Sequence, residues 1–138
     1  MGQTVGYLLK EITDKIKVSA DASFKLRNLS FSQARLLECL SDREGRATQK
    51  SIEEFLKVSH PTVVGLISRM EKKGYLRCYQ DENDKRNKIV EMTENARLIA
   101  HEMQDEVAAQ EAKLLKGLTK EEIESLKRML QMMYRNIQ

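Results

Sequence analysis

The sequence predicts a mainly α-helical fold with one small β-hairpin. Three observations support this fold class: apolar residues recur with helical spacing along most of the 138 residues, the chain has only one proline and six glycines, and a short β-favouring segment follows Gly74. At this length we expect one compact unit, or one small domain with extensions that cannot fold alone.

The helices and strands follow from local spacing, caps and turn formers. The elements expected before the hairpin are, in order, a helix over 4–24, a second helix capped by Ser32 and ending near Leu40, a short third helix opened by Thr48 or Gln49, a turn at 57–59, and a fourth helix ending at Gly74. Two strands near 75–79 and 88–92 then flank a loop rich in turn formers. Thr93 can cap a fifth helix to about Lys116, and Thr119 with Glu122 forms a capping box for a sixth.

The fourth helix combines an apolar face with an unusual opposite face. Its apolar stripe consists of Val63, Leu66, Ile67 and Met70. The opposite face is small near the start of the helix and cationic near its end; it carries Pro61, Gly65, Ser68 and Lys72, flanked by Val64 and Arg69. Glycine costs a helix about 1 kcal/mol relative to alanine, so Gly65 suggests a close approach of the helix backbone to another molecule. The alternatives are a tolerated surface glycine or tight packing inside the protein.

The turn at 57–59 and the helix after it have the pattern of a helix-turn-helix. The second helix of this motif enters the major groove of DNA. The candidate DNA-binding residues of this recognition helix are His60, Pro61, Thr62, Val64, Gly65, Ser68, Arg69 and Lys72. Val64 can contact a thymine methyl, and polar side chains such as Thr62 can bond to bases or phosphates. His60 taken alone fits a plain exposed residue equally well.

The hairpin behind this helix has the features of a DNA-binding wing. Its candidate residues are Asp84, Lys85, Arg86, Asn87 and Lys88. A thin ribbon with a basic tip fits the minor groove, and Asp84 is close enough in sequence to orient the Arg86 guanidinium. Residues 57–88 hold eight Lys or Arg against four Asp or Glu, whereas the whole chain has a net charge of only +3. The basic excess is therefore local, as expected for a surface that meets a polyanion.

Other classes of protein receive little support. Cys39 and Cys78 form no disulfide framework and are expected to be reduced, partly buried thiols, and His60 and His101 lack metal-ligand spacing. No phosphate-binding loop or nucleophile motif is present, so we expect neither an enzyme nor a bound metal or cofactor. The chain shows no signal peptide and no membrane-length apolar run, which predicts a cytoplasmic protein that does not bind membranes.

Heptad spacing predicts that the chain pairs with a second copy of itself. The sixth helix carries such a seam at Ile123, Leu126, Leu130, Met133 and Ile137, and the fifth carries one at Ala96, Ala100, Met103 and Val107. We therefore expect residues 1–26 and 94–138 to form a helical dimerisation region and residues 27–93 to form a winged helix-turn-helix DNA-binding lobe. The alternative is a self-contained helical bundle.

The ordered series of motifs resembles the MarR family of bacterial and archaeal transcriptional regulators. The motifs are Leu29 to Gln33, Val58 to Val63, Met70 to Leu76, Asp84 to Arg86 and Val90 to Thr93. The resemblance implies a homodimer that binds pseudo-palindromic double-stranded DNA, usually as a repressor released by a small ligand or by cysteine oxidation. It also implies that Arg86 is the wing arginine of the minor groove and that Asp84 supports it.

Three departures from the family pattern limit what the resemblance implies. Val64 and Gly65 stand where the family often has Thr-Arg, so base preference does not carry over. Ala96 replaces a usual glycine, and residues 1–26 lack the cysteine of the thiol-sensing branch. The expected function is thus a dimeric, sequence-specific repressor released by a small-molecule effector whose pocket residues are unknown. The alternative is a winged-helix module that binds another protein.

Overall fold

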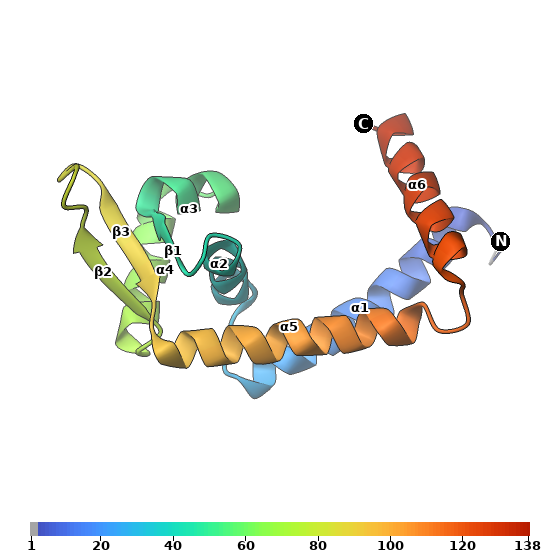
Figure 1. The fold of residues 1–138 in the computed structure, drawn as a ribbon, viewed down its shortest axis with the longest axis horizontal. Helices are drawn as coiled ribbons and strands as arrows, with labels where there is room; N and C mark the ends of the chain where they lie inside the picture. The colour runs from blue at the N-terminus through green and yellow to red at the C-terminus, as the bar shows by residue number, and fades with distance from the viewer. Residues whose placement is uncertain (1–2) are drawn as a thin grey trace. The chain divides into compact units, whose positions relative to one another are not determined.

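A computed structural model describes residues 3–138. The chain divides into two compact units, Met1–Gln104 and Asp105–Gln138, and each is described by itself. The elements are α1 (Val5–Leu26), α2 (Phe31–Ser41), β1 (Arg46–Thr48), α3 (Gln49–Leu56), α4 (His60–Lys72), β2 (Leu76–Gln80), β3 (Lys88–Met92), α5 (Glu94–Leu114) and α6 (Lys120–Asn136) (Figure 1). The predicted fold class is confirmed: this is a mainly α-helical, winged-helix chain.

Most helix starts lie where the sequence placed them, because each has a side chain that accepts a backbone N–H bond. The Thr48 side chain caps α3, and the Ser59 side chain caps α4. Thr119 and Glu122 form the expected capping box at α6. The prediction for α2 was wrong by two residues, because Ser30, not Ser32, is the cap. Ser30 is favoured because its backbone N–H donates to the side-chain oxygen of Gln33, three positions later, while its hydroxyl accepts from the Gln33 N–H.

The wing is a three-stranded antiparallel sheet in the order β1-β3-β2. The predicted hairpin is present, with Cys78 opposite Val90 and Gln80 opposite Lys88. Strand β1 was not predicted, because three residues are too few to show an alternating pattern. It adds to the far side of β3, with Ala47 opposite Val90, and so joins the hairpin to the body of the lobe.

The core of the first unit lies between the sheet and helices α2, α3 and α4. The stripe predicted for α4 is confirmed, because Val63, Leu66, Ile67 and Met70 are all buried. They pack with buried residues from α2, α3 and the sheet, namely Leu36, Leu37, Leu40, Ile52, Leu76, Val90 and Met92. This packing fixes which face of α4 is turned away from the protein.

The stripe predicted for α5 has a different role over its first half. Ala96 and Ala100 are buried and belong to the core of the lobe, and Met103 packs partly against that core. Only Val107, 67% exposed, lies open in the described chain. The expectation that this whole stripe forms an intermolecular seam is therefore wrong for its beginning: the small alanines let α5 pack closely on its own lobe.

Candidate nucleic-acid interface

The structure turns the outer face of α4 away from the core. Most of the predicted recognition residues are exposed there: His60, Pro61, Thr62, Val64, Arg69 and Lys72. Gly65 and Ser68 are partly exposed. None of the eight is buried, so the interpretation in which Gly65 serves internal packing loses its support.

Gly65 leaves real space at the middle of this face. A Cβ atom placed on Gly65 would meet the Arg69 guanidinium first, with the nearest nitrogen 3.4 Å away, which is ordinary van der Waals contact. The fold itself therefore does not require glycine here. Two explanations for glycine are left: a closely approaching partner outside the chain, or a tolerated surface glycine.

The start of α4 is held in place by the turn before it. Lys57 ends α3 in the left-handed conformation, with φ of 56°, and so reverses the chain. The Ser59 hydroxyl accepts a bond from the Thr62 N–H at 3.4 Å and lies 2.8 Å from the Thr62 hydroxyl. Pro61 occupies the first turn, where its missing N–H costs nothing. The first turn of α4 thus presents polar groups and the positive end of the helix dipole on the outside.

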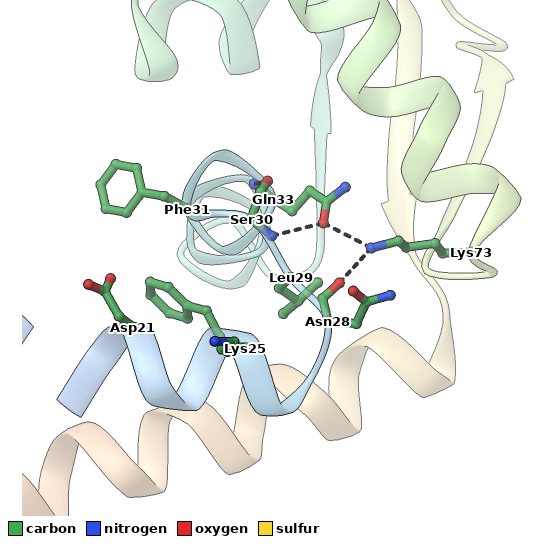
Figure 2. A pocket seen from close by; sticks show the side chains of 9 residues that line it. Asp21, Lys25, Asn28, Leu29, Ser30, Phe31, Gln33 and Lys73 are labelled. Atoms are coloured by element: carbon green, nitrogen blue, oxygen red, sulfur yellow. Dashed lines mark hydrogen bonds between the residues drawn. The ribbon is translucent and has the colours of Figure 1, made fainter. Parts of the chain in front are cut away.

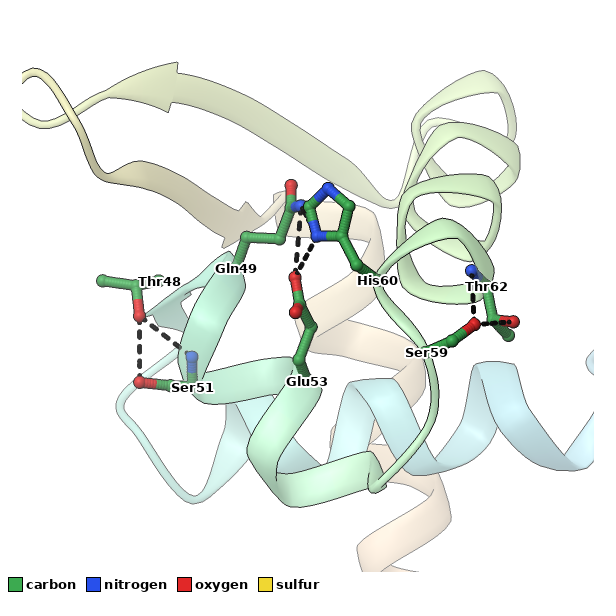
Figure 3. Close-up of polar contacts among 7 residues, drawn as sticks. All are labelled: Thr48, Gln49, Ser51, Glu53, Ser59, His60 and Thr62. Atoms are coloured by element: carbon green, nitrogen blue, oxygen red, sulfur yellow. Dashed lines mark hydrogen bonds and ion pairs between the residues drawn. The ribbon is translucent and has the colours of Figure 1, made fainter.

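A cluster across the turn was not found from the sequence. The Nδ1 atom of His60 lies 2.7 Å from Oε2 of Glu53, a residue of α3 (Figure 3). The amide nitrogen of Gln49, one turn earlier, lies 3.4 Å from the same carboxylate oxygen. The His60 bond contributes most to lowering the pKa of Glu53. The four-residue spacing of Gln49 and Glu53 places both on one side of α3, but only the packing of α3 on α4 reveals their partner.

The wing carries the predicted Asp84–Arg86 pair. The guanidinium donates from Nε to one carboxylate oxygen at 3.0 Å and from a terminal nitrogen to the other at 3.1 Å. The Arg86 backbone N–H also donates to Asp84 at 3.1 Å. Bonding to Arg86 holds the pKa of Asp84 below its usual value. The Arg86 side chain is 90% exposed, so it is oriented from one side and open on the other.

The remaining wing residues differ in exposure. Lys85 and Lys88 are exposed, whereas Asn87 is partly buried. Asn87 closes the loop: its N–H donates to the Asp84 carbonyl and its carbonyl accepts from Asp81, both at 3.0 Å. Asn87 is thus a structural residue of the wing as much as a candidate for DNA contact.

A hollow of about 460 Å³ lies where α1 meets α2 (Figure 2). It is lined by Asp21, Phe24, Lys25, Asn28, Leu29, Ser30, Phe31, Gln33 and Lys73. Lys73, the residue that ends α4, donates to the Asn28 carbonyl at 2.6 Å and to the Gln33 side chain at 3.0 Å. One wall of the hollow is therefore tied to the end of the recognition helix.

The two cysteines are free thiols in unreactive surroundings. Cys39 is fully buried, and burial raises its pKa. Burial and the nearby Glu71 carboxylate raise the pKa of Cys78 to about 11. Within residues 3–138 no three His, Cys, Asp or Glu side chains gather in a way that could hold a metal ion. No helix in that range is long and apolar enough to cross a membrane.

Comparisons with known proteins agree with this geometry. The MarR family model matches residues 29–88. An uncharacterized HTH-type transcriptional regulator of Bacillus subtilis, YwoH, is 31% identical over 135 residues, which cover 93% of this chain and 97% of YwoH. Among solved structures, MepR, a transcription regulator of the Staphylococcus aureus multidrug efflux pump MepA, is similar with a TM-score of 0.79 and 26% identity, covering 98% of this chain and 99% of MepR. The MepR–DNA complex is similar with a TM-score of 0.76 and 27% identity, covering 96% and 99%.

Proposed function

The chain belongs to the MarR family of DNA-binding transcriptional regulators, and on that premise we propose that it acts as a homodimeric repressor of pseudo-palindromic operators that a small ligand releases. The outward face of α4, with its open Gly65 and with the wing next in the chain, is the observation that carries the DNA-binding part of the proposal. Family membership also supports the expectation that the chain is not an enzyme. We place its action in the cytoplasm, where such a regulator meets its DNA.

Roles for the site residues follow from their positions. The first turn of α4 would enter the major groove, where Thr62 and His60 would bond to base edges or phosphates and Val64 would contact a methyl group. Arg69 and Lys72, at the far end of the helix, would contact the phosphate backbone. Arg86, held by Asp84, would enter the minor groove, whose narrow parts attract arginine.

Exposed apolar side chains on α1 support a homodimer. No residue of α1 is buried in the described chain, although its heptad-spaced residues are apolar. The exposed members of this face are Val5 at 59%, Leu9 at 36%, Ile12 at 42% and Ile16 at 36%. Helix α6 likewise has no buried residue, and its Leu130 and the following Ile137 are exposed. We propose that a second copy of the chain covers these apolar faces. In such a dimer, two recognition helices about 34 Å apart would match the two halves of a palindromic site.

The hollow beside α1 and α2 supports release by a ligand. The ring centroids of Phe24 and Phe31, which both line it, lie 6.4 Å apart, and Lys25 and Lys73 supply positive charge. We propose that it takes a small aromatic molecule with an acceptor group. A ligand that bonds to Lys73 would compete with the Asn28 carbonyl and so loosen the link between α1 and the end of α4.

The test begins with footprinting on the DNA upstream of the gene itself. Wild type should protect a site with two-fold symmetry, and affinity should fall about 10³–10⁵-fold between 50 and 200 mM salt if about 6–10 phosphates are neutralised. Arg86→Ala should weaken binding at least tenfold, with a change in the free energy of unfolding below about 0.5 kcal/mol because the side chain is exposed. Unchanged affinity in this variant would reject the proposed role of the wing.

The dimer needs a separate measurement. Sedimentation should give twice the chain mass for wild type, and Ile12→Glu should shift the protein towards monomer because a charge would enter the proposed apolar seam. The Lys17→Glu change, at another exposed position of α1 outside that seam, is the control. A wild-type monomer at micromolar concentration that still protects a symmetric site would contradict the proposed assembly.

A further inference from the structure

We propose that Glu53 is a positioning residue that fixes the proton of His60 on Nδ1, so that Nε2 faces DNA and the base preferred by His60 depends on whether the ring is protonated. The inference rests on the proposed function in one respect, namely that the first turn of α4 lies against base edges. The position of the proton on His60 depends only on contacts between α3 and α4, and it can be measured without DNA.

The position of the proton follows from the contact with Glu53. Oε2 of Glu53 lies 2.7 Å from Nδ1 of His60, which is a short hydrogen bond. The pKa of Glu53 is lowered, chiefly by this bond, so the group is a carboxylate at neutral pH. A carboxylate can only accept hydrogen bonds. Nδ1 must therefore carry a hydrogen whether the imidazole ring is neutral or positively charged.

Gln49 supports the carboxylate rather than the ring. Its amide nitrogen lies 3.4 Å from both Nδ1 of His60 and Oε2 of Glu53. An amide nitrogen and an N–H both donate, so they cannot bond to each other. The contact of Gln49 that can form a bond is the one to Glu53. That bond adds a second donor to the oxygen that holds His60.

The second ring nitrogen of His60 is left for a partner outside the chain. The His60 side chain is 64% exposed, and Figure 3 shows its other nitrogen pointing away from Glu53. With the hydrogen on Nδ1, Nε2 of a neutral ring can only accept. It can then bond to the amino group of adenine or cytosine in the major groove, but not to guanine N7 or O6 or to a phosphate.

Protonation reverses this preference. Both nitrogens of a charged imidazole donate, so Nε2 would bond to guanine or to a phosphate oxygen and would no longer accept from an amino group. A neutral His60 would thus prefer an amino-bearing base, and a charged His60 would prefer an acceptor.

Glu53 is the charged group of α3 that contacts His60. Lys50 and Glu54, the other charged residues of α3, form no hydrogen bond or ion pair with His60 in the part of the chain that the structure describes. On α4 itself, the charged residues Arg69, Glu71 and Lys72 lie nine, eleven and twelve residues further along the helix, more than two turns away.

The other elements that pack on α4 direct their charges elsewhere. Arg35 of α2 and Arg43, in the turn after α2, lie over the Phe55 ring. Arg77 of β2 pairs with Glu91 of β3. The carboxylate of Glu53 is therefore the neighbouring charge that the experiments must change.

The first experiment reads the tautomer directly. The chain has only two histidines, so a long-range proton–nitrogen NMR spectrum of the rings is simple to assign with the His60→Ala variant. At pH 8, wild type should show His60 with the hydrogen on Nδ1. Glu53→Gln should lose this uniform state, because an amide side chain can accept from or donate to Nδ1. Glu54→Gln removes the same charge from the next, exposed position and should behave as wild type. A wild-type ring with its hydrogen on Nε2 would overturn the inference.

The second experiment measures base preference. Four operators that differ only at the base pair under the first turn of α4 are compared at pH 8 and pH 5.5 and at constant ionic strength. Ratios between operators cancel general effects of charge on affinity. Wild type should prefer adenine or cytosine at pH 8 and guanine at pH 5.5, each by about 5–10-fold. Glu53→Gln should bring the preference at pH 8 below about twofold, and Glu54→Gln should leave it unchanged.

The outcomes separate this inference from the proposed function. If Arg86→Ala weakens operator binding while His60→Ala leaves the base preference and its pH dependence unchanged, the role of His60 is rejected and the regulator stands. Equal effects of Glu53→Gln and Glu54→Gln would reject the role of Glu53. If the wild-type protein protects no upstream DNA, the proposed function fails, and the part of the inference that concerns bases fails with it.

Discussion

Replacing Gly65 by alanine should separate the needs of the fold from the needs of DNA binding. Gly65 lies inside α4, where alanine is favoured by about 0.8–1.0 kcal/mol. The added methyl would touch only the Arg69 guanidinium closely, at 3.4 Å, and that flexible group can move. We therefore expect Gly65→Ala to raise the free energy of unfolding by about 1 kcal/mol. For a chain of this size the melting temperature should rise by about 4 °C.

The same methyl should weaken operator binding. It would stand on the face that we propose lies closest to the groove, and keeping it there would push the helix backbone away from the bases. We expect the Kd for the operator to rise at least tenfold, which is about 1.4 kcal/mol. Stability would be measured by urea unfolding and affinity by fluorescence anisotropy, on the same protein preparation.

Gly6→Ala is the matched control for this experiment. Gly6 lies near the start of α1, and a Cβ there would meet nothing within 4 Å. It should give part of the helix-propensity gain without changing operator affinity. If Gly65→Ala is more stable and binds DNA as tightly as wild type, the close approach of α4 to DNA is refuted. If Gly65→Ala is less stable, the open space assigned to this face is wrong.

Three further predictions concern the turn before β1, the thiols and the hollow. Gly45→Ala should lower the free energy of unfolding by about 1–2 kcal/mol in a urea titration, because Gly45 has φ of +90° and an added Cβ would lie 2.5 Å from the Arg97 guanidinium. With a pKa of about 11, Cys78 should be alkylated slowly at pH 8 and faster as pH rises towards 11. Peroxide should leave operator affinity unchanged. Rapid oxidation with loss of binding would instead indicate a redox sensor. Lys73→Met should reduce the effect of benzoate, as an aromatic acceptor probe, on operator affinity, and an undiminished effect would remove Lys73 from the release mechanism.

The sequence predicted best those features that a single element carries. The buried stripe of α4 follows from helical spacing alone, and the Asp84–Arg86 pair spans only two residues of one loop. Local pattern failed where two solutions competed or where partners were distant. Ser30 and Ser32 are both suitable helix caps, and only the bond from the Ser30 N–H to the Gln33 side chain decides between them. Strand β1 exists because β3 offers it an edge, which no pattern within Arg46–Thr48 could indicate.

The same distinction explains why the DNA-binding face could be proposed from sequence and the ligand site could not. The outer face of α4 is defined by what its inner face buries, so one helix is enough to name its residues. The hollow takes residues from Asp21 to Lys73, and its link to α4 is a bond from Lys73 to the Asn28 carbonyl, an atom that every residue type possesses. The contact between Glu53 and His60 was only partly predictable from sequence. The two residues are seven positions apart, and they meet only because the turn at Lys57 directs α4 back along α3. The proposed coupling between a ligand and DNA would therefore act through contacts between elements. Lys73 and Glu53 each join α4 to another segment, so substitutions there should reveal the proposed coupling first.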